Sequence, residues 1–168
     1  LQQGFKPRVA SVGKAILFPV AVEALGKDGN NLSSEVWWSP SHPFKSSLTG
    51  QSAREIATAY EQATKKQWTQ PIGFVHALFE VAVDVLKRSA AKNDPKATVA
   101  AIAATQLDTV VGHIEWSGKE LPPFAQKNIA KTPLVGGQWR LRDSAKYDIV
   151  ITDNKTAPAI PVGGKMEP

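Results

Sequence analysis

The sequence predicts an α/β fold with mainly parallel sheets flanked by helices. Short strand-like segments alternate with helical patterns through the first part of the chain, an order typical of βα units. Two further strand-like segments, 133–141 and 146–154, then follow each other closely. No repeat of fixed period interrupts this order, so the chain is expected to build one α/β architecture rather than a solenoid.

The composition is that of an ordinary globular protein. The chain has 168 residues, of which 42% are hydrophobic and 21% charged. Its formal net charge of +5 comes from bases scattered among 15 acidic residues, which favours solubility over a nucleic-acid or acidic partner. Cysteine is absent, which excludes disulfides and thiolate catalysis. The longest apolar run, 15–22, is too short to span a bilayer.

The sequence does not begin with methionine, and its first residues do not have the pattern of a signal peptide. Residues 1–13 lack a basic start, an apolar middle and a small-residue cleavage site. We therefore expect an internal start, as in a processed, cleaved or expressed fragment.

The first elements are expected to be strand, short helix and strand. Residues 8–13 are β-prone, and the following apolar segment ends at Gly26 and Gly29. A second strand spans 35–38, because Pro40 cannot continue a ladder. Trp37 and Trp38 then point to opposite faces, so one packs inside and the other faces water, a cleft or a partner.

Three helices follow. Ser52 and Glu55 form a capping box that begins the first helix. The second, 74–88, is apolar nearly all round and must be covered on most sides. Asp94 before Pro95 caps the third.

The last third of the chain is expected to form strands and an irregular tail. Residues 107–116 predict a turn and a short strand, and the strands at 133–141 and 146–154 flank a polar turn at Asp143 and Ser144. The tail, 157–168, is rich in proline and glycine, which predicts irregular structure.

A polar stripe on the long helix has the spacing of a candidate site. His76, Glu80 and Asp84 lie four apart, but no second ligand cluster completes a metal site, so we interpret them as a solvated stripe. His76 alone is placed in the first helical turn, where N–H groups attract anions. No metal and no cofactor are predicted.

Several enzyme and nucleotide signatures are absent from the sequence. No G-x-S-x-G elbow, no complete phosphate loop and no interleaved aromatic and basic platform is present. Apolar and aromatic side chains remain at strand ends and helix starts, where open α/β sheets form ligand crevices. Ligand binding is therefore favoured over catalysis.

The order of segments resembles a known family. The runs GFKPRVASVGKA, SSEVWWSPSHPF, PIGFVHALFEVAVDVLKRS, VAAIAATQLDTVVGHIEW and LVGGQW are similar to the C-terminal portion of ABC importer solute-binding proteins of the branched-chain amino acid (Leu/Ile/Val) family. This resemblance implies part of a two-lobed periplasmic-binding-protein-like fold of type I, with three crossovers, a ligand between the lobes, and the N-terminal part missing.

The resemblance also implies a division of the chain. Residues 1–68 would belong to the second lobe, 69–125 would return to the first lobe, and 126–168 would hold the final crossover strands and tail. The helix at 74–88 would then have lost part of its cover. We expect its partner to be the missing N-terminal half or a second copy in a homodimer.

Candidate ligand-binding residues follow from the same resemblance. Lys14 stands where amino acid binders carry an acidic residue, which favours an anionic ligand. His76 falls on the family's tyrosine at the start of the long helix, and aromatic side chains could wall the cleft. The expected set is Lys14, Ala15, Trp37, Trp38, Phe44, Phe74 and His76.

The implied function is that of an exported ligand-binding component of an ABC importer. It would bind a small amino acid or aromatic carboxylate without catalysis, present it to a membrane permease, and act in the periplasm or another extracytoplasmic space, with no nucleic acid partner. Two alternatives stay open: a hydrolase using His76 with Glu80, and a ligand-sensing domain of the same fold.

Overall fold

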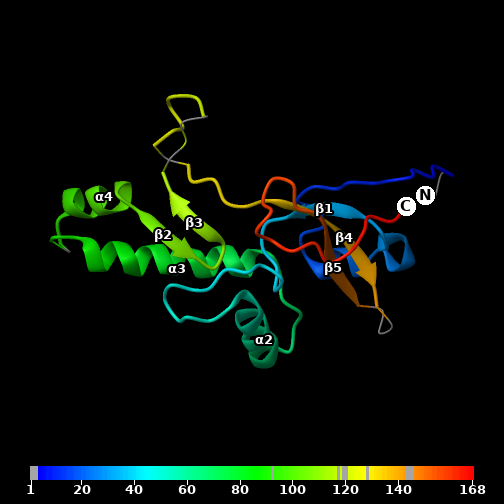
Figure 1. The fold of residues 1–168 in the computed structure, drawn as a ribbon. Helices are drawn as coiled ribbons and strands as arrows, with labels where there is room; N and C mark the ends of the chain where they lie inside the picture. The colour runs from blue at the N-terminus through cyan, green and yellow to red at the C-terminus, as the bar shows by residue number, and fades with distance from the viewer. Residues whose placement is uncertain (1–3, 92, 117, 119–120, 128, 143–145) are drawn as a thin grey trace.

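The computed structural model describes residues 4–91, 93–116, 118, 121–127, 129–142 and 146–168. Figure 1 shows an elongated molecule with the sheet of β1, β4 and β5 at one end and helices α3 and α4 at the other. Helix α2 lies between these two groups, on one side of the molecule. The N and C labels both lie at the sheet end.

The sheet end is built from strands distant in sequence. Its order is β1 (Ser33–Val36), β4 (Val135–Leu141) and β5 (Tyr147–Asp153). Helix α1 (Pro19–Glu23) and the short 3-10 helix η1 (Gly26–Gly29) belong to the same group. One core cluster unites the segment before α1, α1 itself and the two last strands, through the buried Ile16, Val22, Trp139 and Tyr147.

The helical end is formed by one continuous stretch of the chain. It contains α3 (Pro71–Arg88), α4 (Pro95–Ala103) and a hairpin of β2 (Gln106–Thr109) and β3 (Gly112–Glu115). The predicted Asp94 cap is confirmed, because its carboxylate accepts from the Lys96 N–H at 2.9 Å. A two-residue connection joins β2 to β3, so the expected turn and short strand form a complete hairpin.

Helix α2 (Ala53–Thr64) packs into the core that links the two ends. The capping box of Ser52 and Glu55 is confirmed in both directions. The core below it includes Ile56 from α2, Trp38 and Trp68 from the connections on either side, and apolar residues of α3 and the hairpin. This core sets where the end of β1 lies against the start of α3.

The expected parallel pairing is wrong for the residues that the structure describes. All three ladders are antiparallel, and the one parallel bridge joins Ser11 to Ser33. Short connections explain two of the ladders: β2 to β3 and β4 to β5 are hairpins, whereas a parallel neighbour needs a crossover of a dozen or more residues. The third ladder, β1 with β4, joins strands far apart in the sequence, so connection length does not set its direction. The α/β class itself is confirmed.

Element boundaries differ from the sequence-based expectation in three places. Residues 8–13 contribute the single bridge at Ser11 instead of a strand, and Lys14 at φ 39° turns the chain away. Strand β1 covers 33–36 rather than 35–38. Helix α3 begins at Pro71, three residues early, because proline suits a first helical turn. The turn at Asp143 and Ser144 lies outside the described residues, and the tail is irregular as expected.

One face of α3 is not covered by any residue that the structure describes. Val75, Leu78, Phe79 and Leu86 are each at least half exposed. This exposed apolar face agrees with the expectation that the helix at 74–88 lacks part of its cover in this chain. Among the described helices, none combines the length and apolar character that a membrane span requires.

Candidate functional site

Trp37 and Trp38, directly after β1, differ in how deeply they are buried. Glu35 and Trp37 are half-buried, whereas Val36 and Trp38 between and after them have 0% exposure. Trp38 packs edge-on against Trp68, with ring centroids 6.0 Å apart. Trp38 is thus the tryptophan that packs inside, and Trp37 is the one available to the surface.

Trp37 and Phe74 form an aromatic pair at the junction of β1 and α3. Their ring centroids are 5.9 Å apart and their planes meet at 75°, an edge-to-face arrangement. The fully buried Gln70 holds this junction: its Oε1 accepts from the Trp37 N–H at 2.7 Å and its Nε2 donates to the Glu35 carbonyl at 3.2 Å. The side chain of Trp37 is therefore carried on a fixed backbone.

Gly13 and Lys14 lie beside the carboxylate of Glu35, and Ala15 follows them in the chain. The Lys14 N–H donates to Glu35 Oε1 at 2.9 Å, and a Cβ placed on Gly13 would lie 3.2 Å from Glu35 Oε2. Both Lys14 and Ala15 are exposed. The loop around Lys14 has no acidic residue of its own, but the carboxylate of Glu35 from β1 lies next to it.

We call the set Lys14, Ala15, Glu35, Trp37 and Phe74 the Glu35 surface. It joins a lysine, a carboxylate and two aromatic rings, because Glu35 and Trp37 are two positions apart on an extended chain and so face the same side. Sequence reasoning missed Glu35 and Gln70. Alternation along the strand was the signal for Glu35, since a residue two positions before an outward Trp37 faces the same way.

Phe44 and His76 are engaged elsewhere. Phe44 stacks edge-on with the buried His42, at 6.2 Å between centroids, and packs on the cluster around Val36. His76 Nε2 lies 2.7 Å from the hydroxyl of Ser46, which is itself 3% exposed. Because α3 begins at Pro71, His76 lies in the second helical turn rather than the first.

Glu80 has a structural role. It is 1% exposed; its Oε1 accepts from the N–H and hydroxyl of Ser47, and its Oε2 from the Val110 N–H at 3.1 Å. The solvated-stripe interpretation is therefore wrong for Glu80. In the described part of the chain no hydrogen bond joins it to His76, and no group of three potential ligands is placed to hold a metal.

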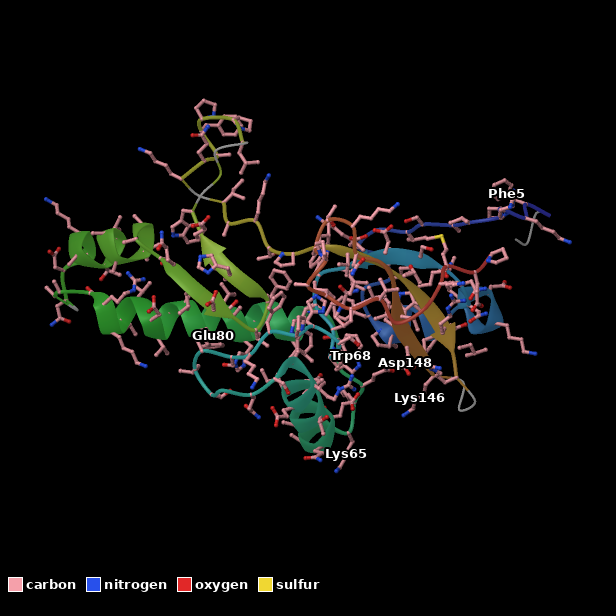
Figure 2. The ribbon with its side chains drawn as sticks, in the orientation of Figure 1. Phe5, Lys65, Trp68, Glu80, Lys146 and Asp148 are labelled. Atoms are coloured by element: carbon pink, nitrogen blue, oxygen red, sulfur yellow. The ribbon has the colours of Figure 1, made fainter. Side chains whose placement is uncertain are left out.

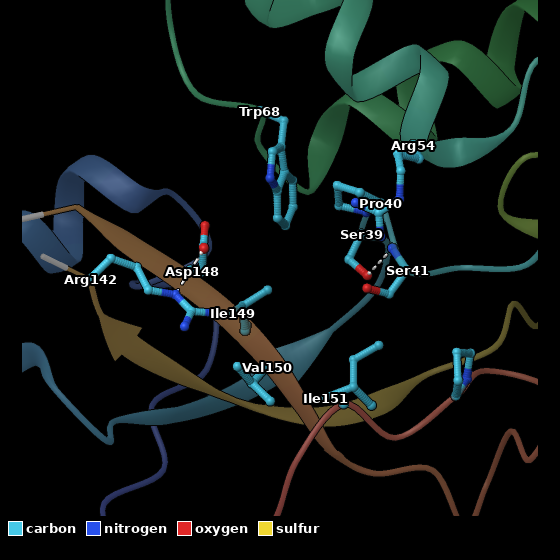
Figure 3. A pocket seen from close by; sticks show the side chains of 12 residues that line it. Ser39, Pro40, Ser41, Arg54, Trp68, Arg142, Asp148, Ile149, Val150 and Ile151 are labelled. Carbon is cyan, nitrogen blue, oxygen red and sulfur yellow. Dashed lines mark hydrogen bonds and ion pairs between the residues drawn. The ribbon is translucent and has the colours of Figure 1, made fainter. Parts of the chain in front are cut away.

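A concave region away from β1 lies between α2 and β5. Figure 3 shows Trp68 and Arg54 on one side of a cavity of about 300 Å³ and Ile149, Val150 and Ile151 on the other. None of the sequence-predicted site residues lines it.

Comparisons with known proteins place the fold. No protein-family model and no curated protein sequence matches the chain. The solved leucine binding protein LivK of Thermotoga maritima is 15% identical, with a TM-score of 0.66, covering 92% of this chain and 39% of that one. A branched-chain amino acid ABC transporter protein of Rhodopseudomonas palustris CGA009 is 12% identical, with a TM-score of 0.63 and coverage of 94% and 39%.

A third similar solved structure holds a bound aromatic acid. It is a solute binding protein of an ABC transporter from Rhodopseudomonas palustris BisB5 in complex with 3,4-dihydroxybenzoic acid, 14% identical, with a TM-score of 0.60 and coverage of 89% and 38%. The chain therefore has the fold of part of an ABC transporter substrate-binding protein, as the sequence resemblance implied. It spans about two fifths of the length of these neighbours.

Proposed function

We propose that this chain is part of the extracytoplasmic ligand-binding component of an ABC importer, which binds a small amino acid or aromatic carboxylate and delivers it to a membrane permease without catalysis. The observation that carries the proposal is the Glu35 surface, on a chain whose fold neighbours are transporter binding proteins. One further neighbour is described as an extracellular ligand-binding receptor, which supports a location outside the cytoplasm.

The charges of the Glu35 surface suit a zwitterion. The Glu35 carboxylate can accept hydrogen bonds from a ligand α-ammonium group, as an ionised acceptor does most strongly. The ammonium group of Lys14 forms no ion pair with a described residue and can meet the ligand carboxylate. The rings of Trp37 and Phe74 then offer apolar surface to the ligand side chain. Lys14 alone suggested an anion, but Lys14 with Glu35 favours an α-amino acid.

The division into lobes is part of the same proposal. Residues 1–68 and 126–168 would form one lobe, which is supported by the pairing of β4 with β1 across the sequence. Residues 69–125 would contribute to the other, supported by the packing of α3 and α4 with the hairpin. The uncovered face of α3 would contact the remainder of that lobe or a second copy. Light scattering together with intact mass distinguishes a second polypeptide from a homodimer.

Calorimetric titration tests the ligand. Leucine and 3,4-dihydroxybenzoate are titrated into the protein at its natural length. The Glu35→Gln variant should weaken leucine binding by about tenfold or more, because it removes the charged partner of the ammonium group. It should leave dihydroxybenzoate binding within about twofold, since that ligand has no ammonium group. Glu23→Gln, an exposed acid on α1, is the matched control.

Two results would reject the proposal. One is an absence of binding heat with every proteinogenic amino acid and with aromatic acids. The other is tight binding that neither Glu35→Gln nor Trp37→Ala weakens, which would place the ligand away from the Glu35 surface.

A further inference from the structure

A continuous groove runs between α2 and the outer edge of β5. The cavity of about 300 Å³ beside Trp68 shares Arg142 and Asp148 with a second cavity of about 510 Å³. The second shares Lys65, Lys66 and Lys146 with a third of about 440 Å³. Figure 2 shows Lys65 at the end of α2 and Lys146 and Asp148 on the sheet side facing it. We call this the α2–β5 groove.

The α2–β5 groove is cationic. Among the described residues, five basic side chains line it, against three acidic ones. Two of the acids are already engaged: Glu61 accepts from the Trp68 N–H at 3.1 Å, and Asp148 from Arg142 Nε at 3.1 Å. The charged groups of four of the bases form no hydrogen bond or ion pair with a described residue: Arg54, Lys65, Lys66 and Lys146. The groove thus presents unpaired positive charge along its length.

The wall of the groove is the outer edge of β5, where the main-chain groups of Ile149 have no hydrogen-bond partner outside the sheet among the described residues. β5 is at the edge of the described sheet. Gln67 Nε2 donates to the Tyr147 carbonyl at 2.7 Å and the Gly163 N–H to the Ile151 carbonyl at 2.8 Å, so both carbonyls point away from β4. Backbone groups alternate along a strand, so the N–H and C=O of Ile149, midway between them, also point away from β4.

One end of the groove is apolar. The third cavity is bounded by Pro19 and Val20 of α1 and by Tyr60 of α2, and Val20 is 69% exposed. An occupant that follows the groove from Ile149 therefore passes unpaired lysines and then reaches an apolar surface.

We propose that the α2–β5 groove binds an extended acidic peptide segment of a partner protein. Main-chain pairing at Ile149 would orient the segment, as in strand addition to an exposed sheet edge. Its carboxylates would meet the unpaired basic side chains, and an apolar residue would occupy the end beside Val20. A small anion could satisfy one lysine, but only an extended chain uses the strand edge and the separated charges together. The inference does not depend on the ligand proposed for the Glu35 surface.

Fluorescence anisotropy with a labelled peptide of sequence Phe-Glu-Val-Glu-Val-Glu tests this on the protein at its natural length. The double variant Lys65→Glu, Lys66→Glu should weaken binding by about tenfold or more, because two attractive charges become repulsive. The matched control is Lys87→Glu with Lys96→Glu, which changes the net charge equally on exposed positions of α3 and α4. This control should leave binding within about twofold.

The strand-edge part is tested without altering the protein. The same peptide with alternate amides N-methylated keeps its charges but cannot pair with Ile149, and it should bind about tenfold more weakly. Equal binding of both peptides would overturn the proposal, since the groove would then be a general anion surface.

Two other results would also overturn the proposal. They are no peptide binding at about 1 mM, and binding to anionic phosphatidylglycerol vesicles but not to the peptide. Leucine titration of the same Lys65 and Lys66 variant should be unchanged, which separates a failure here from a failure of the proposed ligand site.

Discussion

Substitution of Gly73 by alanine tests how the junction between β1 and α3 is packed. Gly73 lies in the first turn of α3, directly over the fully buried indole of Trp38. A Cβ at this position would lie 2.2 Å from Cγ of Trp38 and 2.4 and 2.5 Å from two further ring atoms. Ordinary contact begins at 3.4 Å, so the two groups must separate by about 3.4 − 2.2 = 1.2 Å.

The magnitude is a balance of two effects. Alanine favours the helix by about 1 kcal/mol over glycine. Overpacking a rigid buried ring costs about 1–3 kcal/mol, and the upper end applies here because three ring atoms are contacted at once. We expect a net loss of about 2 kcal/mol in the free energy of unfolding, or about 4–8 °C in melting temperature for a chain of this size.

Urea unfolding followed by tryptophan fluorescence measures the effect. Gly136→Ala is the control, because its Cβ would meet its nearest neighbour at 3.4 Å, which is normal contact. An unchanged or raised stability of Gly73→Ala would refute the packing of Trp38 under α3, and with it the assignment of Trp37 as the surface tryptophan.

Three further changes have defined outcomes. Burial lowers the pKa of His42 from 6.5 to about 4, against the opposing backbone hydrogen bond from Ser39. The histidine of the unfolded chain therefore takes up a proton at a higher pH than the folded one. The contribution of His42 to the free energy of unfolding is full above pH 6.5 and falls by about 3 kcal/mol as the pH drops to about 4. The His42→Gln variant should lack this loss when urea unfolding is measured at each pH. Glu80→Ala leaves the N–H groups of Ser47 and Val110 without their acceptor, and should lower the free energy of unfolding by about 3 kcal/mol in the same assay. The Trp139→Phe variant loses the buried hydrogen bond from the indole Nε1 to the Ile16 carbonyl, which is 2.9 Å long. Its free energy of unfolding should fall by about 1–3 kcal/mol, and no change would mean that this bond is absent in solution.

Local signals in the sequence predicted the helices well. The capping box at Ser52, the Asp94 cap and the apolar run of α3 each depend on residues a few positions apart. The alternation of Trp37 and Trp38 likewise predicted that the two indoles face opposite sides. Such features are local, so no knowledge of the tertiary fold was needed.

Pairing between distant segments was the part that local signals could not supply. The antiparallel sheet depends on the pairing of β1 with β4, which are about a hundred residues apart. The sequence of neither strand indicates which strand it pairs with. The same limit hid the candidate site. Glu35 lies 21 residues from Lys14, and Gln70 lies 33 residues from Trp37, so neither contact shows in a local pattern.

The indole N–H signals of the five tryptophans give the most direct test of the central claim, that the Glu35 surface binds an amino acid. They are followed by two-dimensional NMR of the ¹⁵N-labelled protein at its natural length during addition of leucine. The account predicts a saturable shift of the Trp37 signal, lost in Glu35→Gln, with a smaller change at the buried Trp38. If leucine moves no indole signal, or moves only that of Trp68 in the α2–β5 groove, the assignment of the Glu35 surface as a ligand site is contradicted.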